Sequence, residues 1–340
     1  MVSVRKTKIK AVGLLSGGLD STLAAKLMLE QGIELYAINF ISPFCTCTPK
    51  KAGCAAAITA VKKLGGIMLK RISLGDEYLR MMRNPKHGYG SGTNPCIDCR
   101  IIKIQKAGEY MRKIGASFVV TGEVLGQRPM SQHRTALRII ERESGLEGLI
   151  LRPLSAKLLS PSIPEKEGWI DRERLLEITG RSRKPQMGLA AKYGIVDYPC
   201  PAGGCLLTDP GFARRMRDLM AHSEITLNDI DLLKLGRHFR FMPQAKLVVG
   251  RNKEENERLL RLAKRDDVCF GPAEVKGPIG IGRGHLDQED IQESVSIVAR
   301  YCDGGMDGTV KITNRILPDG KIGMILTESM PYDEIQRYRI

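Results

Sequence analysis

The chain has 340 residues, 42% of them apolar and 27% charged, with a formal net charge of +15. This length suits two domains better than one, and no apolar run approaches the roughly 20 residues that a membrane-spanning helix needs. The basic amino terminus also lacks the apolar core of a secretory signal. We therefore expect a cytoplasmic protein with no membrane partner.

Apolar runs and helical patterns alternate through the first half of the chain, as they do in βαβ units. The expected strands are 10–15, 34–40, 67–72 and 117–121, and the expected helices are 21–30, 55–64 and 101–114. This alternation predicts an α/β domain with a parallel sheet, helices on both faces, and a ligand site at the carboxyl ends of the strands.

The second half begins with a proline-interrupted connection from about Ser155, which contains one expected helix, 172–179, capped by Asp171. A smaller α+β unit follows, with expected helices at 211–221, 228–235, 253–262 and 290–300 and expected strands at 246–249, 309–316 and 322–326. We place the domain boundary at Asp209, so that residues 1–209 form the first domain and residues 210–340 the second.

The positive charge points to a polyanionic partner, because Lys and Arg displace counterions when they bind nucleic acid. A thermophile-like solvated surface is the alternative. The nine cysteines are not expected to form disulfides in a reducing compartment. Their clustering suggests metal ligation or thiol chemistry, and the clustered residues are Cys45, Cys47 and Cys54; Cys96 and Cys99; and Cys200 and Cys205.

Between the first expected strand and helix lies the sequence Ser16-Gly17-Gly18-Leu19-Asp20-Ser21. Its glycines let the backbone approach an anion, and the loop amides with the helix amino terminus form a phosphate cradle. The loop lacks the lysine of a Walker A motif, which suits release of pyrophosphate, and hence adenylation, better than transfer of the γ-phosphate. An ordinary Gly-rich turn with a Ser or Asp cap is the alternative.

These residues resemble the PP-loop signature of the adenine nucleotide α-hydrolase superfamily. The resemblance implies that ATP binds with Mg²⁺, that its α-phosphate is attacked, and that Asp20 orients the metal or the pyrophosphate. Over residues 8–195 the chain also resembles the catalytic domain of the tRNA 4-thiouridine synthetases. Two stretches carry this second resemblance: residues 39–44, where Asn39 and Phe40 would meet the adenine, and residues 121–127, with Gly122 and Gln127.

Two arginines near these stretches are candidate contacts for the nucleotide or RNA. Arg128, next to Gln127, can bond polar groups of either ligand, and Arg152 can neutralise a phosphate. For Arg152 a surface ion pair is the alternative.

The sequence departs from that family because neither the amino-terminal tRNA-binding domain nor the rhodanese domain of the longer synthetases is recognisable. It adds Cys96-x-x-Cys99, whose two thiols at a helix start can hold a metal or form a redox dithiol. This pair resembles the site of cluster-dependent tRNA thiolases, in which three cysteines leave one iron of a [4Fe–4S] cluster open for hydrosulfide. The resemblance implies Cys96, Cys99 and Cys205 as catalytic cluster ligands, with Cys200 competing for the third place. Structural zinc, or a persulfide donor without iron, is the alternative.

The second domain contains Gly236-Arg-His-Phe-Arg240 and later Gly250-Arg-Asn252, and it resembles the RNA-binding domain of NFACT proteins. Basic residues beside an aromatic ring suit phosphate contact and base stacking, and a basic supporting domain is the alternative.

Together these features predict an ATP-dependent tRNA sulfurtransferase that adenylates a uridine carbonyl and replaces its oxygen with sulfur. The resemblance favours 4-thiouridine at position 8, with a tRNA 2-thiouridine synthetase or a zinc-dependent ligase of a nucleobase precursor as alternatives. A nucleotide-sensing RNA-binding protein is the non-enzymatic alternative. The expected partners are tRNA and a hydrosulfide or persulfide donor, and the related synthetases suggest a homodimer.

Overall fold

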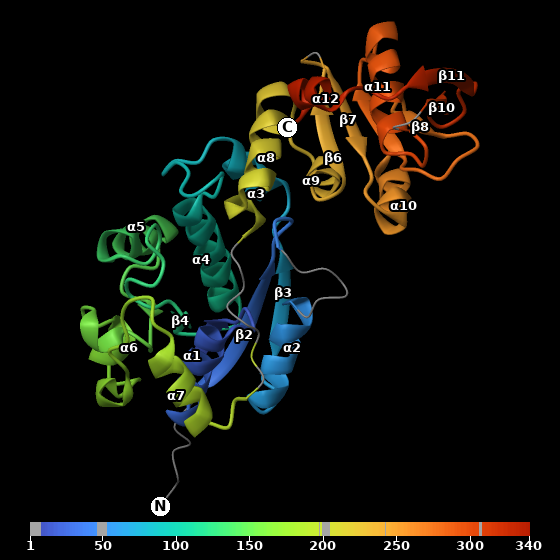
Figure 1. The fold of residues 1–340 in the computed structure, drawn as a ribbon. Helices are drawn as coiled ribbons and strands as arrows, with labels where there is room; N and C mark the ends of the chain where they lie inside the picture. The colour runs from blue at the N-terminus through green and yellow to red at the C-terminus, as the bar shows by residue number, and fades with distance from the viewer. Residues whose placement is uncertain (1–7, 46–52, 197, 199–204, 242, 306–307) are drawn as a thin grey trace, which may run out of the picture. The chain divides into compact units, whose positions relative to one another are not determined.

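The computed structural model describes residues 8–45, 53–196, 198, 205–241, 243–305 and 308–340 (Figure 1). The chain divides into two compact units, Met1–Leu206 and Leu207–Ile340, where the sequence placed the boundary at Asp209. No helix in the described ranges is long and apolar enough to cross a membrane.

The first unit is built on a five-stranded sheet in the order β3-β2-β1-β4-β5. Every pair of neighbouring strands is parallel, so the predicted parallel sheet is confirmed. The strands are β1 (Lys10–Leu14), β2 (Glu34–Ile41), β3 (Leu69–Ser73), β4 (Phe118–Val120) and β5 (Ile150–Leu151). The sequence did not predict β5, because two residues are too few to show a periodicity.

Helices cover both faces of this sheet (Figure 1). Ala11 of β1 packs in a core cluster with Leu23 of the helix that follows the strand. The next residue, Val12, points to the other face and packs in a cluster with Ile104, as the alternation of side chains along a strand requires. The helices are α1 (Leu19–Glu30), α2 (Gly53–Lys63), α3 (Asp76–Arg83), α4 (Cys96–Lys113), α5 (Arg134–Ser144), α6 (Ile163–Lys166) and α7 (Lys184–Lys192).

The predicted helix at 172–179 is wrong. Asp171 does accept a hydrogen bond from the Glu173 amide at 2.9 Å, but only Arg172–Arg174 form a 3₁₀ turn. The residues beyond bond across to another segment instead: the Ile178 amide donates to the Leu154 carbonyl at 2.8 Å. Pairing with a distant segment therefore overrides the local helical pattern.

The second unit is an α+β domain, as predicted, with a six-stranded sheet in the order β11-β10-β8-β9-β7-β6. All its strand pairs are antiparallel. Its strands are β6 (Arg237–Arg240), β7 (Ala245–Val249), β8 (Val268–Pro272), β9 (Gly280–Gly284), β10 (Thr309–Ile316) and β11 (Gly323–Glu328). Its helices are α8 (Pro210–His222), α9 (Leu227–Leu233), α10 (Lys253–Leu262), α11 (Gln288–Arg300) and α12 (Tyr332–Tyr338).

Strand β9 escaped prediction because its alternate residues are glycines, which are rare in strands. The close packing of the sheet explains them: a Cβ on Gly280 would lie 2.9 Å from the Val298 side chain of α11, and one on Gly282 would lie 2.7 Å from Leu286. Glycine lets this helix and the loop before it come close to the sheet.

Candidate functional site

The PP-loop connects β1 to α1 at the carboxyl edge of the parallel sheet. Ser16 and Ser21 close the loop, with their hydroxyl oxygens 3.1 Å apart, and the Ser21 hydroxyl donates to the Gly18 carbonyl at 2.9 Å. Gly17 has a φ of +81°, and a Cβ there would lie 2.4 Å from the backbone of Ala56. The loop therefore requires glycine at this position.

The amino end of α1 is open to an anion. Gly18 is the N-cap residue, and no side chain caps the first turn of this 12-residue helix. The amides of that turn thus keep their hydrogen-bonding capacity, and the helix dipole adds partial positive charge. This is the local geometry that binds phosphate groups in other proteins.

At the PP-loop, Asp20 contacts a residue of the stretch 121–127. One carboxylate oxygen accepts a hydrogen bond from the Gln127 side chain at 3.1 Å, and the other is buried without a partner in the described residues. Gly122 packs on the loop so closely that a Cβ would lie 2.5 Å from the Ser21 nitrogen. The structure therefore brings Asp20 together with Gly122 and Gln127, which lie about a hundred positions further along the chain.

Asn39 and Phe40 are placed differently. The Asn39 side chain is buried and donates to the Leu15 carbonyl at 3.0 Å, so it supports the strand end that leads into the loop. Phe40 is half-buried and packs against the core between the sheet and α4. Contact of these two residues with adenine stays a prediction.

The cysteine pair occupies the first turn of α4, which begins at Cys96, five residues earlier than expected. Cys99 is within hydrogen-bonding reach of the hydroxyl of Tyr78, a buried residue of α3 that also approaches Ser42 and Cys205. The Cys205 sulfur lies 3.8 Å from the Phe44 carbonyl oxygen. Cys99 and Cys205 thus share one neighbour, the Tyr78 hydroxyl, which the sequence analysis did not identify because no local motif marks it.

The two thiols of the pair differ in their electrostatic surroundings. Burial opposes ionisation of Cys99, but Lys103, Tyr78 and Arg100 outweigh it and lower the pKa of this thiol. For Cys96, burial and then the neighbouring Cys99 raise the pKa, despite nearby cations. Cys99 is therefore the thiol that more readily becomes a thiolate, the reactive and ligating form.

These cysteines do not form a closed metal site. Among the residues that the structure describes, no three His, Cys, Asp or Glu side chains are placed to hold a metal ion together. Cys47 and Cys200 lie outside the described residues, as does the side chain of Cys54, while Cys45 is half-buried. The competition between Cys200 and Cys205 is thus left open.

A buried network of ion pairs links the stretch 121–127, which follows β4, to the start of α4. Glu123 is 2% exposed; it accepts hydrogen bonds from Thr121 at 3.2 Å and from the Arg152 Nε at 3.0 Å and pairs with Arg100 at 3.4 Å. Arg152 also pairs with Glu141. Arg152 is 3% exposed, so the expected phosphate contact is wrong, and its ion pairs are buried and not at the surface as the alternative had them.

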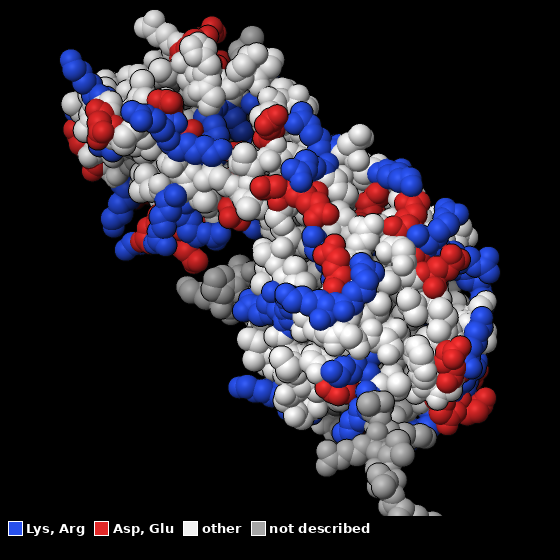
Figure 2. All heavy atoms as spheres, turned by 180° about the vertical axis from the view of Figure 1, so that it is seen from behind, with Lys and Arg blue, Asp and Glu red and all other residues white. Residues whose placement is uncertain are grey.

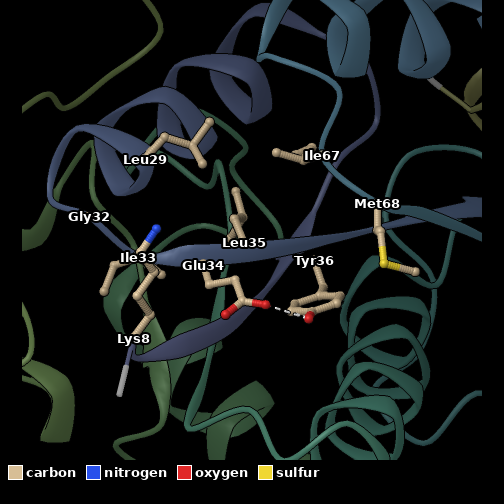
Figure 3. A pocket seen from close by; sticks show the side chains of 9 residues that line it. All are labelled: Lys8, Leu29, Gly32, Ile33, Glu34, Leu35, Tyr36, Ile67 and Met68. Atoms are coloured by element: carbon tan, nitrogen blue, oxygen red, sulfur yellow. Dashed lines mark hydrogen bonds between the residues drawn. The ribbon is translucent and has the colours of Figure 1, made fainter. Parts of the chain in front are cut away.

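A cavity of about 380 Å³ lies at the opposite edge of the sheet, where β2 and β3 begin (Figure 3). Leu29, Glu34, Tyr36 and Met68 contribute to its lining, and the Tyr36 hydroxyl donates to Glu34 at 2.5 Å. This cavity is therefore distinct from the site that contains the PP-loop, Cys96 and Cys99.

In the second unit, the Gly236–Arg240 motif is largely buried. His238 is 2% exposed and Phe239 is fully buried, and Arg240 forms two hydrogen bonds with Asp218, at 3.0 and 2.6 Å. The expectation that the ring of Phe239 stacks on bases is therefore wrong, whereas contact of the half-buried Arg237 with phosphate stays a prediction. Residues 237–240 of the motif form β6, the edge strand of its sheet, and Arg240 ties this strand to Asp218 of α8.

Comparison with known proteins identifies two segments of the chain. Residues 6–157 match the family described as thiamine biosynthesis protein (ThiI), and residues 236–339 match the NFACT protein RNA binding domain. The first segment contains the PP-loop, the cysteine pair and the Gly122–Gln127 stretch.

The curated relatives share only part of their length with this chain. A probable tRNA sulfurtransferase of Thermococcus kodakarensis is 27% identical over 44% of this chain and 37% of its own. A tRNA-specific 2-thiouridylase of Pelobacter propionicus is 31% identical over 34% of this chain and 33% of its own. The chain thus spans about a third of the length of these relatives.

Among solved structures, a 4-thiouridine synthetase–RNA complex with bound ATP aligns with a TM-score of 0.34 and 22% identity. The alignment covers 55% of this chain and 51% of that one. On the evidence of the two family matches, the chain joins a ThiI-type domain to an NFACT-type RNA-binding domain.

Proposed function

We propose that this protein is an ATP-dependent tRNA sulfurtransferase. The observation that carries the proposal is the open PP-loop, whose Asp20 keeps one buried oxygen without a partner in the described residues. It lies in a segment that matches the ThiI family and also contains Cys96 and Cys99. The names of several relatives support it, because they are described as tRNA sulfurtransferases.

In the proposed first step, Ser16–Ser21 hold the ATP phosphates, and the unpartnered Asp20 oxygen binds Mg²⁺. Gln127 fixes the Asp20 carboxylate through its hydrogen bond. The uridine carbonyl oxygen attacks the α-phosphate, and pyrophosphate leaves as the adenylate forms. The target uridine must leave its stack to reach this loop.

In the proposed second step, sulfur attacks the activated ring carbon and AMP leaves with the former carbonyl oxygen. We assign Cys96, Cys99 and Cys205 as ligands of a [4Fe–4S] cluster, which when bound would offer an open iron for hydrosulfide. Their thiols are suitable donors, and Cys99 and Cys205 both approach Tyr78, although the described residues form no closed cage. A persulfide is the alternative donor.

We favour 4-thiouridine at position 8 as the product. A relative described as a tRNA-specific 2-thiouridylase keeps 2-thiouridine as the second candidate. The tRNA is treated anaerobically with reconstituted protein, ATP and sulfide, and mass spectrometry of its nucleosides detects the gain of sulfur. Because the two products are isomers of equal mass, chromatography against 2-thiouridine and 4-thiouridine standards tells them apart. Absence of any thionucleoside, with ligation of a free nucleobase precursor instead, would contradict the proposal.

Asp20→Ala tests the nucleotide step. This variant should lose thiolation and tRNA-dependent pyrophosphate release, because the metal-binding oxygens are removed, while its affinity for tRNA stays within about threefold of wild type. Undiminished pyrophosphate release in Asp20→Ala would show that the phosphate site lies elsewhere.

A further inference from the structure

The net charge of this protein is confined to its first unit. From Leu207 to Ile340, Lys and Arg together equal Asp and Glu in number, so the whole excess of +15 belongs to the residues before Leu207. On the face seen in Figure 2, basic and acidic side chains are interspersed. A stretch without acids is therefore informative about where a polyanion binds.

Several stretches of the first unit have no acidic residue, and two of them meet in the fold next to residues that contact the PP-loop. Between Glu123 and Glu141 the chain has no acidic residue, and between Glu177 and Asp197 it again has none. We define the basic rim as the Lys and Arg residues of these two stretches other than Lys192, which ends α7: Arg128, Arg134, Arg138, Arg181, Arg183 and Lys184.

The two stretches are joined in the fold. The Leu125 carbonyl accepts hydrogen bonds from the Gly180 amide at 2.8 Å and from the Thr179 hydroxyl at 3.0 Å, and Leu125 and Thr179 form a parallel bridge. The chain continues from one side of this junction to Arg128 and from the other to Arg181. Cations far apart in sequence are thereby brought onto one border of the domain.

This border adjoins the proposed site. Gln127, next to Arg128, contacts Asp20 of the PP-loop, and Glu123 of the same stretch pairs at 3.4 Å with Arg100, which follows Cys99 in the chain. A polyanion on the basic rim would therefore lie beside both the nucleotide loop and the cysteines.

The rim cations are available for binding. Five of the six are exposed and Arg183 is half-buried. Within the described ranges, none of them forms an ion pair, whereas other cations of the unit, such as Arg100, Lys157 and Arg172, do. Five are arginines, whose planar guanidinium groups bind phosphate with two parallel hydrogen bonds.

We propose that the basic rim is the surface on which the tRNA backbone lies when its target uridine enters the PP-loop site. This inference rests on the proposed function and adds the location of the RNA contact. RNA fits better than an acidic protein segment because the rim borders a nucleotide site and is rich in arginine.

The test compares two triple variants that each remove three positive charges. The rim variant is Arg181→Ala/Arg183→Ala/Lys184→Ala. The control is Lys62→Ala/Arg112→Ala/Lys113→Ala, whose residues lie in the last turns of α2 and α4, at the opposite edge of the sheet. A second rim variant, Arg134→Ala/Arg138→Ala, tests the other stretch, and equal thermal midpoints with wild type establish that each variant folds.

Binding of unmodified tRNA is measured without ATP over a series of salt concentrations. The rim triple variant should weaken binding at least about tenfold at low salt and reduce the slope of log Kd against log salt by about 2. The control should change Kd by less than about threefold.

The outcomes separate this inference from the proposed function. If wild type thiolates tRNA but the rim and control variants bind it equally well, the rim assignment is overturned and the function stands. If the rim variant loses tRNA binding as expected but wild type makes no thionucleoside, the rim is still the RNA-binding surface and the proposed enzymatic function is overturned. Competition by polyglutamate as strong as that by tRNA would overturn the choice of RNA.

Discussion

Single residues explain why this site requires particular side chains. Gly122 has no room for a Cβ against the Ser21 backbone, and Asp20 is held by one hydrogen bond from Gln127. Gln127 was predicted from its motif, whereas the contact that gives it a role depends on the packing of β4 beside β1.

At the residue scale, Gly122→Ala should destabilise the protein by about 1–3 kcal/mol, because the new methyl group must displace the PP-loop backbone. The matched control is Gly188→Ala in α7, where a Cβ would meet no atom within 4 Å. Since alanine favours helix more than glycine does, that variant should gain about 0.5–1 kcal/mol. Denaturant unfolding measures both, and equal midpoints for the two variants would contradict the packing described here.

Glu123 yields a second prediction at this scale. Burial works against its ionisation, but Arg100 and Arg152 prevail and lower its pKa. A carboxylate with a lowered pKa stabilises the fold above the pKa of the unfolded chain, and this stabilisation is lost as the pH falls further.

Glu123→Gln should therefore cost about 3 kcal/mol at neutral pH, since it leaves a buried arginine partly unpaired. Below about pH 4.5, the ordinary pKa of glutamate, the difference from wild type should shrink. Unfolding free energies at pH 7 and pH 4 measure this, with Glu147→Gln, at an exposed position, as the control. A deficit that is the same at both pH values would contradict an ionised Glu123.

At the scale of elements, α4 carries much of the proposed sulfur chemistry. Its first turn presents Cys96 and Cys99, Arg100 anchors it to Glu123, and α3 brings Tyr78 beside Cys99. The amphipathic pattern from residue 101 onward identified the helix in the sequence. Its true start at Cys96 was less visible, because Pro95 and the cysteines do not resemble a usual cap.

The iron content of anaerobically purified protein tests this element. Cys96→Ala, Cys99→Ala and Cys205→Ala should each lose iron and thiolation, because every thiolate supplies one bond to the cluster. Cys200→Ala and Cys302→Ala should retain both. Adenylation should survive in all five variants, as it needs only the PP-loop and a placed uridine. Full thiolation with stoichiometric zinc and no iron would eliminate the cluster and favour a persulfide.

At the scale of the whole molecule, the two units differ in charge although both are expected to contact tRNA. The basic motif of the second unit is engaged internally, since Arg240 is held by Asp218 and Arg237 stacks on Tyr301 at 4.3 Å. We therefore expect this unit to contribute shape and uncharged contacts rather than most of the phosphate contacts. The predicted homodimer stays a prediction.

Removal of Leu207–Ile340 should accordingly weaken tRNA binding but leave the salt dependence nearly unchanged, because that unit has no net charge. Binding of tRNA to the full chain and to the 1–206 fragment, over the same salt series, provides the measurement. If removal of the second unit also lowered the slope of log Kd against log salt, the phosphate contacts would lie in that unit.

Features that depend on short-range patterns could be predicted from the sequence alone. Alternating periodicities predicted the parallel sheet, and the Ser16–Ser21 loop could be identified because its glycines and helix start are contiguous. Which distant groups meet became known from the folded structure. It placed Tyr78 near both Cys99 and Cys205, paired the buried Arg152 with Glu123, and enclosed Phe239 in a core. Burial and ion pairing arise from residues far apart in the chain, so local patterns could not reveal them.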